Sequence, residues 1–226
     1  PQMIRRLRSR GAVLTSKGNV HQLLFSAECG NHIFGPGLNP LDPTRTSGGS
    51  SGGEAALVAL GFNNAAIGTD IGGSVRIPSF FCGISGLKPT SRRVSTKAQA
   101  SFFCRNYGSD VRPRQVNSKY DKQFVIPTCL GPLARKVEDL QKVMAVLVED
   151  QSFDRNVTPI PWRRNPNFPK KVGVFKGSSL CELCPTAKRA IDESIQALLE
   201  AKYEVVECDI EELFDEAVDL AVQACG

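Results

Sequence analysis

Two short segments of the chain combine paired glycines with serines, at residues 47–54 and 68–76. The first holds two serines between two glycine pairs, and in the second a glycine pair directly precedes Ser74. Glycine costs stability in ordinary helices and strands, so this density implies unusual backbone angles or a close approach of the backbone. Each segment runs into an expected helix, whose first N–H groups are free to bind an anion or an oxyanion. The residue types therefore suit nucleophilic chemistry by a serine.

Other kinds of glycine-rich loop need residues that these segments lack. A phosphate-binding loop requires a lysine after its last glycine, but Glu54 follows Gly53. A dinucleotide-binding loop requires G-x-G-x-x-G between a strand and a helix, and neither segment has this spacing. A flexible Gly/Ser linker fits the composition alone. It is disfavoured because residues 54–61 are apolar with helical spacing directly after the first loop.

A serine nucleophile needs a proton acceptor, which in many enzymes is a histidine. The sequence contains two histidines, His21 and His32, and neither has an acidic neighbour to orient it. Chain order alone leaves a Ser-His-Asp triad open, because the order of the triad residues differs between folds.

The composition is that of a globular protein, with 226 residues, 41% of them hydrophobic, and a formal net charge of +5. The apolar runs reach only core length, so we expect no membrane-spanning helix, and no signal-peptide pattern is visible. The four arginines in residues 5–10 are interpreted as the solvated face of a helix whose Ile4 and Leu7 point inward. This modest charge does not indicate binding to DNA or RNA, and we predict no nucleic-acid partner.

The eight cysteines are predicted to be reduced thiols, because no secretion signal accompanies them. Cys181 and Cys184 form an isolated C-x-x-C pair, whereas a zinc site needs four ligands. We therefore predict no metal site and no cofactor.

Apolar periodicity alternates between strand-like and helix-like segments, which predicts an α/β fold with a mixed twisted sheet flanked by helices. The expected strands are residues 11–15, 65–67, 172–175 and 203–208. The expected helices are residues 19–26, 54–61, 137–148, 187–201 and 213–224. Residues 28–53 are expected to form a long functional loop, and the four prolines in residues 151–170 predict a linker.

The run from residue 48 to residue 95 resembles the amidase signature family closely. It begins GGSSGGE and contains GTDIGGSVRIPSFFCG, and the likeness extends downstream to LGPLAR at residues 130–135. Within the family, the chain is most similar to the animal fatty acid amide hydrolases. The features that indicate this subgroup include Glu54 and the proline-rich residues 157–161.

The resemblance implies a Ser–Ser–Lys relay in which Ser74 is the nucleophile. Ser50 matches the bridging serine, which sits on a cis peptide bond in the family. The backbone N–H groups of Ile71, Gly72, Gly73 and Ser74 match the oxyanion hole. Small residues beside the nucleophile agree with this, since they let donors approach an oxyanion to about 2.7–3.1 Å.

Other positions carry supporting roles over from the family. Ser51, Asp70 and Arg76 match polar residues that brace the catalytic loops. Leu24 and Phe25 match positions that flank the acyl pocket of the lipid-type enzymes, where Ser50 also meets the substrate. For Leu24 and Phe25, the interior of an ordinary helix is an equally open interpretation.

The catalytic lysine of the family has no counterpart here, because Lys17 and Lys88 match other lysines. We therefore interpret residues 1–226 as a single incomplete amidase signature domain. Residues 1–96 and 125–226 match the family, and residues 97–124 are a divergent surface insertion. Such a chain is expected to be inactive or nearly so, since losing one member of a catalytic unit costs about as much as losing all.

The function that the resemblance implies is hydrolysis of amide bonds, with long-chain fatty acid amides as the expected substrates. The alternative is an inactive relative that binds lipid or a partner protein. The resemblance also allows a homodimer and association of the full-length protein with a membrane surface. The expected location is intracellular, at endomembranes for the full-length protein.

Overall fold

The computed structural model describes residues 2–96, 128–149, 154, 157–163, 170–180 and 182–225. The chain divides into two compact units, Pro1–Trp162 and Arg163–Gly226, each of which is described by itself. The boundary between the units falls within the predicted proline-rich linker. The predicted insertion at residues 97–124 and the thiol of Cys181 lie outside the described residues.

A three-stranded antiparallel sheet forms the centre of the first unit. Strand β5 (Cys129–Ala134) lies between β3 (Ala65–Asp70) and β4 (Ser85–Gly86). All residues of β5 are buried, as expected for the middle strand of a covered sheet. The register pairs Asp70 with Cys129, so β3 ends where β5 begins.

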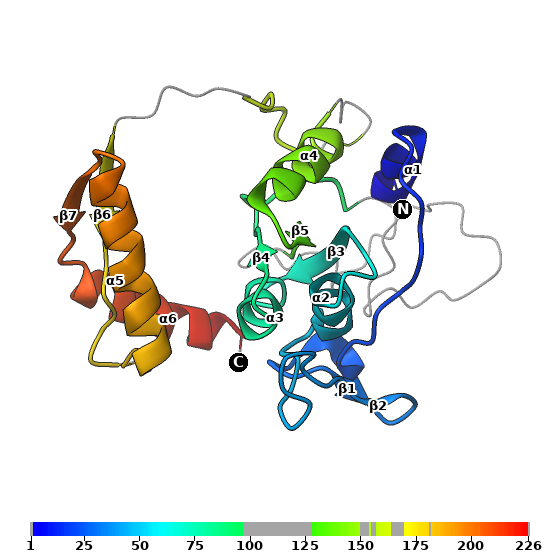
Figure 1. Cartoon of the computed structure of the whole chain (residues 1–226), viewed down its shortest axis with the longest axis horizontal. Coiled ribbons are helices and arrows are strands. Elements are labelled where there is room, and N and C mark those ends of the chain that lie inside the picture. The colour runs from blue at the N-terminus through cyan, green and yellow to red at the C-terminus, as the bar shows by residue number, and fades with distance from the viewer. Residues whose placement is uncertain are drawn as a thin grey trace. The chain divides into compact units, whose positions relative to one another are not determined.

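Helices cover both faces of this sheet (Figure 1). Helix α4 (Val137–Leu147) packs on one face, and α2 (Gly52–Ala59) and α3 (Arg76–Phe81) pack on the other. The predicted helices at residues 54–61 and 137–148 are confirmed. One core cluster is made of Val94, Leu130, Met144, Leu147 and Val148, and the other of Ala55, Val75, Cys82 and Leu133.

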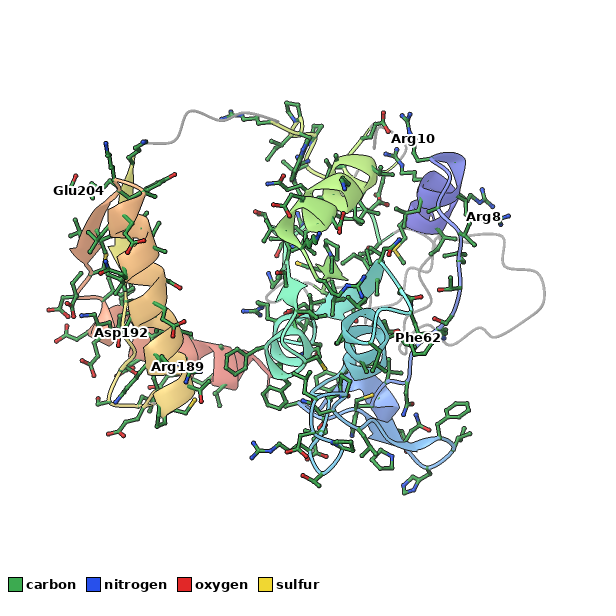
Figure 2. The ribbon with its side chains drawn as sticks, viewed as in Figure 1. Arg8, Arg10, Phe62, Arg189, Asp192 and Glu204 are labelled. Carbon is green, nitrogen blue, oxygen red and sulfur yellow. The ribbon has the colours of Figure 1, made fainter. Side chains whose placement is uncertain are left out.

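The arginine-rich segment forms helix α1 (Gln2–Ser9), which packs on α4. Leu7 faces the core as predicted, and Met3 rather than Ile4 joins it there. Arg10, labelled in Figure 2, follows the helix and pairs with Glu149.

Two predicted elements near the N-terminus were wrong. Residues 11–15 form no strand, and Val13 is 84% exposed, because no neighbouring strand in the described chain pairs with this segment. Residues 19–26 contain only the 3₁₀ turn η1 (Gln22–Leu24). Leu23 and Leu24 have φ angles of 68° and 65°, a left-handed conformation that a right-handed helix cannot continue.

The long loop at residues 28–53 contains one short antiparallel pair, β1 (Gly30–Asn31) and β2 (Gly35–Pro36). Side-chain hydrogen bonds hold other parts of this loop in place. Asn39 is buried and donates to the Phe81 carbonyl at the end of α3 at 2.8 Å. The loop is therefore fastened to the helix that follows Ser74.

The second unit is a parallel strand pair with two helices, as the C-terminal periodicity predicted. Strands β6 (Lys171–Val174) and β7 (Glu204–Glu207) pair in parallel and are connected by α5 (Pro185–Glu200). Helix α6 (Glu211–Cys225) follows, and its Phe214 ring lies 5.2 Å from the Phe175 ring. Figure 2 shows Arg189 and Asp192 on α5 and Glu204 on β7, all exposed. Among the described residues of the chain, no helix combines the length and the apolar character that crossing a bilayer requires.

Candidate active site

The first Gly/Ser loop is buried at the start of α2. Ser50 is 1% exposed, and the Gly49–Ser50 peptide bond is cis, as the family resemblance implied. Ser51 is the N-cap of α2, and its hydroxyl makes no capping hydrogen bond. The loop therefore places Ser50 two residues before the first residue of α2, against the packed interior of the first unit.

Protein groups already occupy the first N–H groups of α2. Gly53 N–H donates to the Asn19 carbonyl at 2.9 Å. Burial raises the pKa of the neighbouring Cys29 thiol, although the N–H groups of Gly53 and Gly52 act on its sulfur in the opposite direction. The start of α2 is consequently capped from within the protein and is not the open anion site that its sequence suggested. Sequence reasoning missed Asn19 and Cys29 because they lie far upstream.

The second loop is built around Asp70, the last residue of β3. Its carboxylate accepts hydrogen bonds from the backbone N–H groups of Gly73 (2.9 Å), Val75 (3.1 Å) and Arg76 (3.3 Å). The Arg76 guanidinium adds two more, from Nε to Oδ2 at 3.0 Å and from Nη2 to Oδ1 at 2.9 Å. The Asp70 carboxylate thus binds backbone N–H groups on both sides of Ser74 and fixes the conformation of this loop.

This pair shifts the pKa values of both partners. Burial raises the pKa of Asp70, but the hydrogen bonds from Arg76 and from the N–H groups of Val75 and Gly73 outweigh it and lower the pKa below its ordinary value. The pKa of Arg76 is raised by the same hydrogen bonds, which its guanidinium donates to Asp70. Asp70 is therefore a charged structural group at neutral pH. The prediction that Asp70 and Arg76 brace this loop agrees with the geometry.

The backbone around Ser74 leaves donors available. Gly73 has a φ of +130°, and a Cβ there would lie 2.6 Å from Ile77 Cδ1, so only glycine fits. Its N–H is engaged by Asp70. Within the described residues, the N–H groups of Gly72 and Ser74 donate to no acceptor. Gly72 is exposed and Ser74 is half-buried, so a ligand can reach these two donors.

One backbone hydrogen bond joins the two loops. The Ser51 N–H donates to the Ser74 carbonyl at 3.1 Å. The structure thereby brings the two predicted catalytic serines to adjoining loops, although no hydrogen bond joins their hydroxyl groups in the described part of the chain. The site thus contains two serines on adjoining loops. Ser74 lies beside N–H groups that have no acceptor among the described residues, and Ser50 is buried.

Of the predicted acyl-pocket residues, Leu24 is the last residue of the turn η1 and Phe25 is its C-cap. Phe25 is 63% exposed and Leu24 is also exposed, so neither lies in the interior of a helix. The helix-core interpretation of these two residues was wrong. Their contribution to an acyl pocket stays a prediction.

Comparison with known proteins identifies the family. A family profile described as Amidase matches residues 2–225. The chain belongs to the amidase family. Vitamin D3 hydroxylase-associated protein of Gallus gallus is 36% identical over 205 residues, covering 88% of this chain and 40% of that protein. Fatty-acid amide hydrolase 1 of Sus scrofa is 35% identical, covering 88% of this chain and 32% of that protein.

Solved amidase structures have the same fold. A fatty acid amide hydrolase structure superposes with a TM-score of 0.77 at 29% identity, over 92% of this chain and 34% of its own. A 6-aminohexanoate cyclic dimer hydrolase complexed with substrate superposes with a TM-score of 0.74 at 27% identity, over 92% and 41%. The chain spans about a third to two fifths of the length of these relatives. The mixed α/β fold and the amidase resemblance are thus confirmed.

Proposed function

We propose that this amidase hydrolyses amide bonds through Ser74, with Ser50 as the proton relay. The observation that supports the proposal is the Ser51–Ser74 backbone hydrogen bond, which joins the loop of the buried Ser50 to the loop of Ser74, where the Gly72 and Ser74 N–H groups have no acceptor among the described residues. Ser74 Oγ attacks the amide carbonyl while its proton passes to Ser50. The N–H groups of Gly72 and Ser74, together with that of Ile71, stabilise the resulting oxyanion.

The relay needs a terminal base to complete the reaction. In the family this base is a lysine, which takes the proton from Ser50 and later returns it through the serines to the leaving amine. The resemblance assigns that role to no lysine in residues 1–226. We therefore expect the 226-residue chain to turn over amides very slowly, and a protein that includes the lysine to be active.

Long-chain fatty acid amides are the proposed substrates. The supporting observations are the similarity to proteins named fatty acid amide hydrolases and the exposed apolar Leu24 and Phe25 near the predicted pocket. Apolar side chains of this kind suit a hydrocarbon tail. Membrane-surface association and a homodimer of the whole protein are further parts of the proposal.

The test is active-site labelling with an alkyl fluorophosphonate, which reacts with an activated serine. The protein used is a chimaera in which residues 1–226 replace the matching part of the Sus scrofa enzyme, so that the lysine is supplied. We expect the adduct on Ser74, located by mass spectrometry, and no adduct in the Ser74→Ala variant. Ser50→Ala should slow the labelling reaction but leave the adduct on Ser74. An adduct on Ser50, or undiminished labelling of Ser74→Ala, would overturn the assignment.

A further inference from the structure

Glu54 is a half-buried acid next to the Ser50 loop, and the proposed reaction does not use it. It occupies the third position of α2, three residues after the N-cap Ser51. At this spacing a glutamate ordinarily accepts the N–H of the N-cap residue, in a capping box. Here the Ser51 N–H donates to the Ser74 carbonyl instead. The Glu54 carboxyl is thereby left for another contact.

That contact is the backbone at Gly18. A Cβ on Gly18 would lie 2.5 Å from Glu54 N and 2.9 Å from Glu54 Cδ, so the two residues are in close contact. The next residue, Asn19, accepts the Gly53 N–H at 2.9 Å. Glu54 and Asn19 thus fasten the upstream segment to the first turn of α2, beside Ser50.

One carboxyl oxygen of Glu54 has no partner. Oε2 is buried and forms no hydrogen bond within the described residues. An ionised carboxylate with a buried, unpaired oxygen is costly, whereas a protonated one removes the charge. Burial accordingly raises the pKa of Glu54, while the N–H groups of Glu54 and Gly18 and the charge of Lys17 lower it less than burial raises it. Cys29 is the other titratable group that senses Glu54, and the Glu54 charge raises the pKa of its thiol.

We propose that Glu54 is a positioning residue that holds the Ser50 loop in register while its carboxyl is neutral. The structural part stands on the contacts of Glu54 with Gly18 and α2, and the consequence for catalysis rests on the proposed function. Ionisation would draw the carboxyl toward Lys17 and water. The Gly53–Asn19 and Ser51–Ser74 hydrogen bonds would then loosen together.

The first test measures hydrogen exchange of the Ser51 and Gly53 amides in the 226-residue chain. Glu54→Ala should speed exchange at both amides about tenfold, the equivalent of one lost hydrogen bond. Glu54→Gln keeps the shape and stays neutral, so exchange should remain slow. Glu138→Gln is the matched control, since Glu138 also lies in the first turn of a helix, α4, but is exposed. Equal exchange at both amides in Glu54→Ala and the parent chain would overturn the proposal.

The second test uses pH and does not require the alanine variant to fold. The pKa of Glu54 is lower in the unfolded state than in the folded state. The parent chain therefore loses stability as the pH rises from the unfolded-state pKa to the folded-state pKa. The melting temperature of Glu54→Gln should therefore exceed that of the parent by a margin that grows with pH and then levels off. The exchange rate of the Ser51 amide should rise with the same midpoint after correction for intrinsic exchange. A margin independent of pH would contradict the neutral-carboxyl mechanism.

Labelling of the chimaera separates this proposal from the proposed function. Fluorophosphonate labelling of Ser74 should slow by up to about 100-fold in Glu54→Ala, because small misplacements near a site have effects of this size. In Glu54→Gln, labelling should lose the part of its pH dependence that Glu54 ionisation causes. If the chimaera itself is not labelled, the proposed function fails, and amide exchange and melting still decide the role of Glu54.

Discussion

The backbone N–H of Ser51 lies 3.1 Å from the carbonyl oxygen of Ser74 and donates a hydrogen bond to it. Ser51 supports the site through this main-chain bond, since its hydroxyl makes no capping bond and is buried against Gly68 of β3. The positions of the two serine loops are therefore coupled through the backbone and through packing on β3.

Adding a methyl group at Gly68 should disturb that coupling. A Cβ there would lie 2.6 Å from Ser51 Oγ in the first loop and 2.9 Å from Val75 Cγ2 in the second, so it would clash with both loops. We expect Gly68→Ala to lower the free energy of unfolding by about 1–3 kcal/mol, as overpacking does. Gly72→Ala is the matched control for stability, because nothing lies within 4 Å of a Cβ at Gly72. Chemical denaturation of the two variants should separate them, and equal stabilities would contradict the packing argument.

The two partners of the Asp70–Arg76 pair should differ in their importance for stability. The Asp70 side chain is 0% exposed and that of Arg76 is 54% exposed. Asp70→Asn weakens the acceptor of the buried Gly73 and Val75 N–H groups and of the partly buried Arg76 N–H, so we expect a loss of about 2–4 kcal/mol. Arg76→Gln leaves Asp70 with its backbone donors and should cost about 1 kcal/mol, as for a half-exposed ion pair. If Arg76→Gln lost more stability than Asp70→Asn, the backbone hydrogen bonds to Asp70 would contribute less to stability than the ion pair does.

The same carboxylate predicts an acid-sensitive component of stability. The pKa of Asp70 is lowered in the folded state, so its contribution is fully present above the ordinary carboxyl pKa of about 4 and is lost as pH falls through the lowered value. The stability difference between the parent chain and Asp70→Asn should therefore shrink in acid. Urea unfolding at a series of pH values measures it. A difference that stayed constant below pH 4 would count against an ionised Asp70.

The sequence predicted the local elements whose patterns are complete within one segment. Helices α2 and α4 and the β6–α5–β7 unit follow from apolar spacing over consecutive residues. Strand β5 was not predicted, because Gly131 and Pro132 interrupt it. Its environment accounts for both residues. A Cβ on Gly131 would lie 2.1 Å from the Leu87 carbonyl oxygen, and the Pro132 carbonyl accepts the Leu87 N–H at 3.0 Å.

The candidate site was predicted in its residues but not in its connections. Glycine pairs and serines identified both loops, whereas the capping of α2 by Asn19 depends on a contact between distant segments. Composition could not show that Asp70 engages the Gly73 N–H, whereas the Gly72 and Ser74 N–H groups find no acceptor in the part of the chain that the structure describes. The predicted helix at residues 19–26 failed for a related reason. Apolar spacing does not reveal that two successive leucines adopt left-handed angles.

The cysteines near the first loop should resist modification in the folded chain. Cys29 and Cys82 are buried, and burial raises the pKa of Cys82 to about 11, with the Cys29 charge adding to it. At pH 8 the Cys82 thiolate is then about a thousandth of the total, and iodoacetamide reacts with the thiolate. Among the cysteines whose side chains the structure describes, Cys184 is the exposed one and should react before Cys29 and Cys82. Peptide mass spectrometry before and after denaturation measures the order, and fast alkylation of Cys82 in the folded chain would contradict it.

The chimaera is expected to prefer amides with long acyl chains. Leu24 and Phe25 are exposed apolar residues where the acyl tail is predicted to pass, and each buried methylene is worth about 0.8 kcal/mol. Lengthening a primary amide from about four to about twelve carbons should then raise kcat/KM of the chimaera by several orders of magnitude until the pocket is filled. Because the Sus scrofa portion also contributes to any pocket, the profile is compared with that of Leu24→Ala and Phe25→Ala variants of the same chimaera. These variants should lose more activity on long amides than on short ones. Three outcomes would contradict lipid specificity and still agree with a general amidase. They are a flat profile, a maximum at acetamide or an amino-acid amide, and equal losses at every chain length.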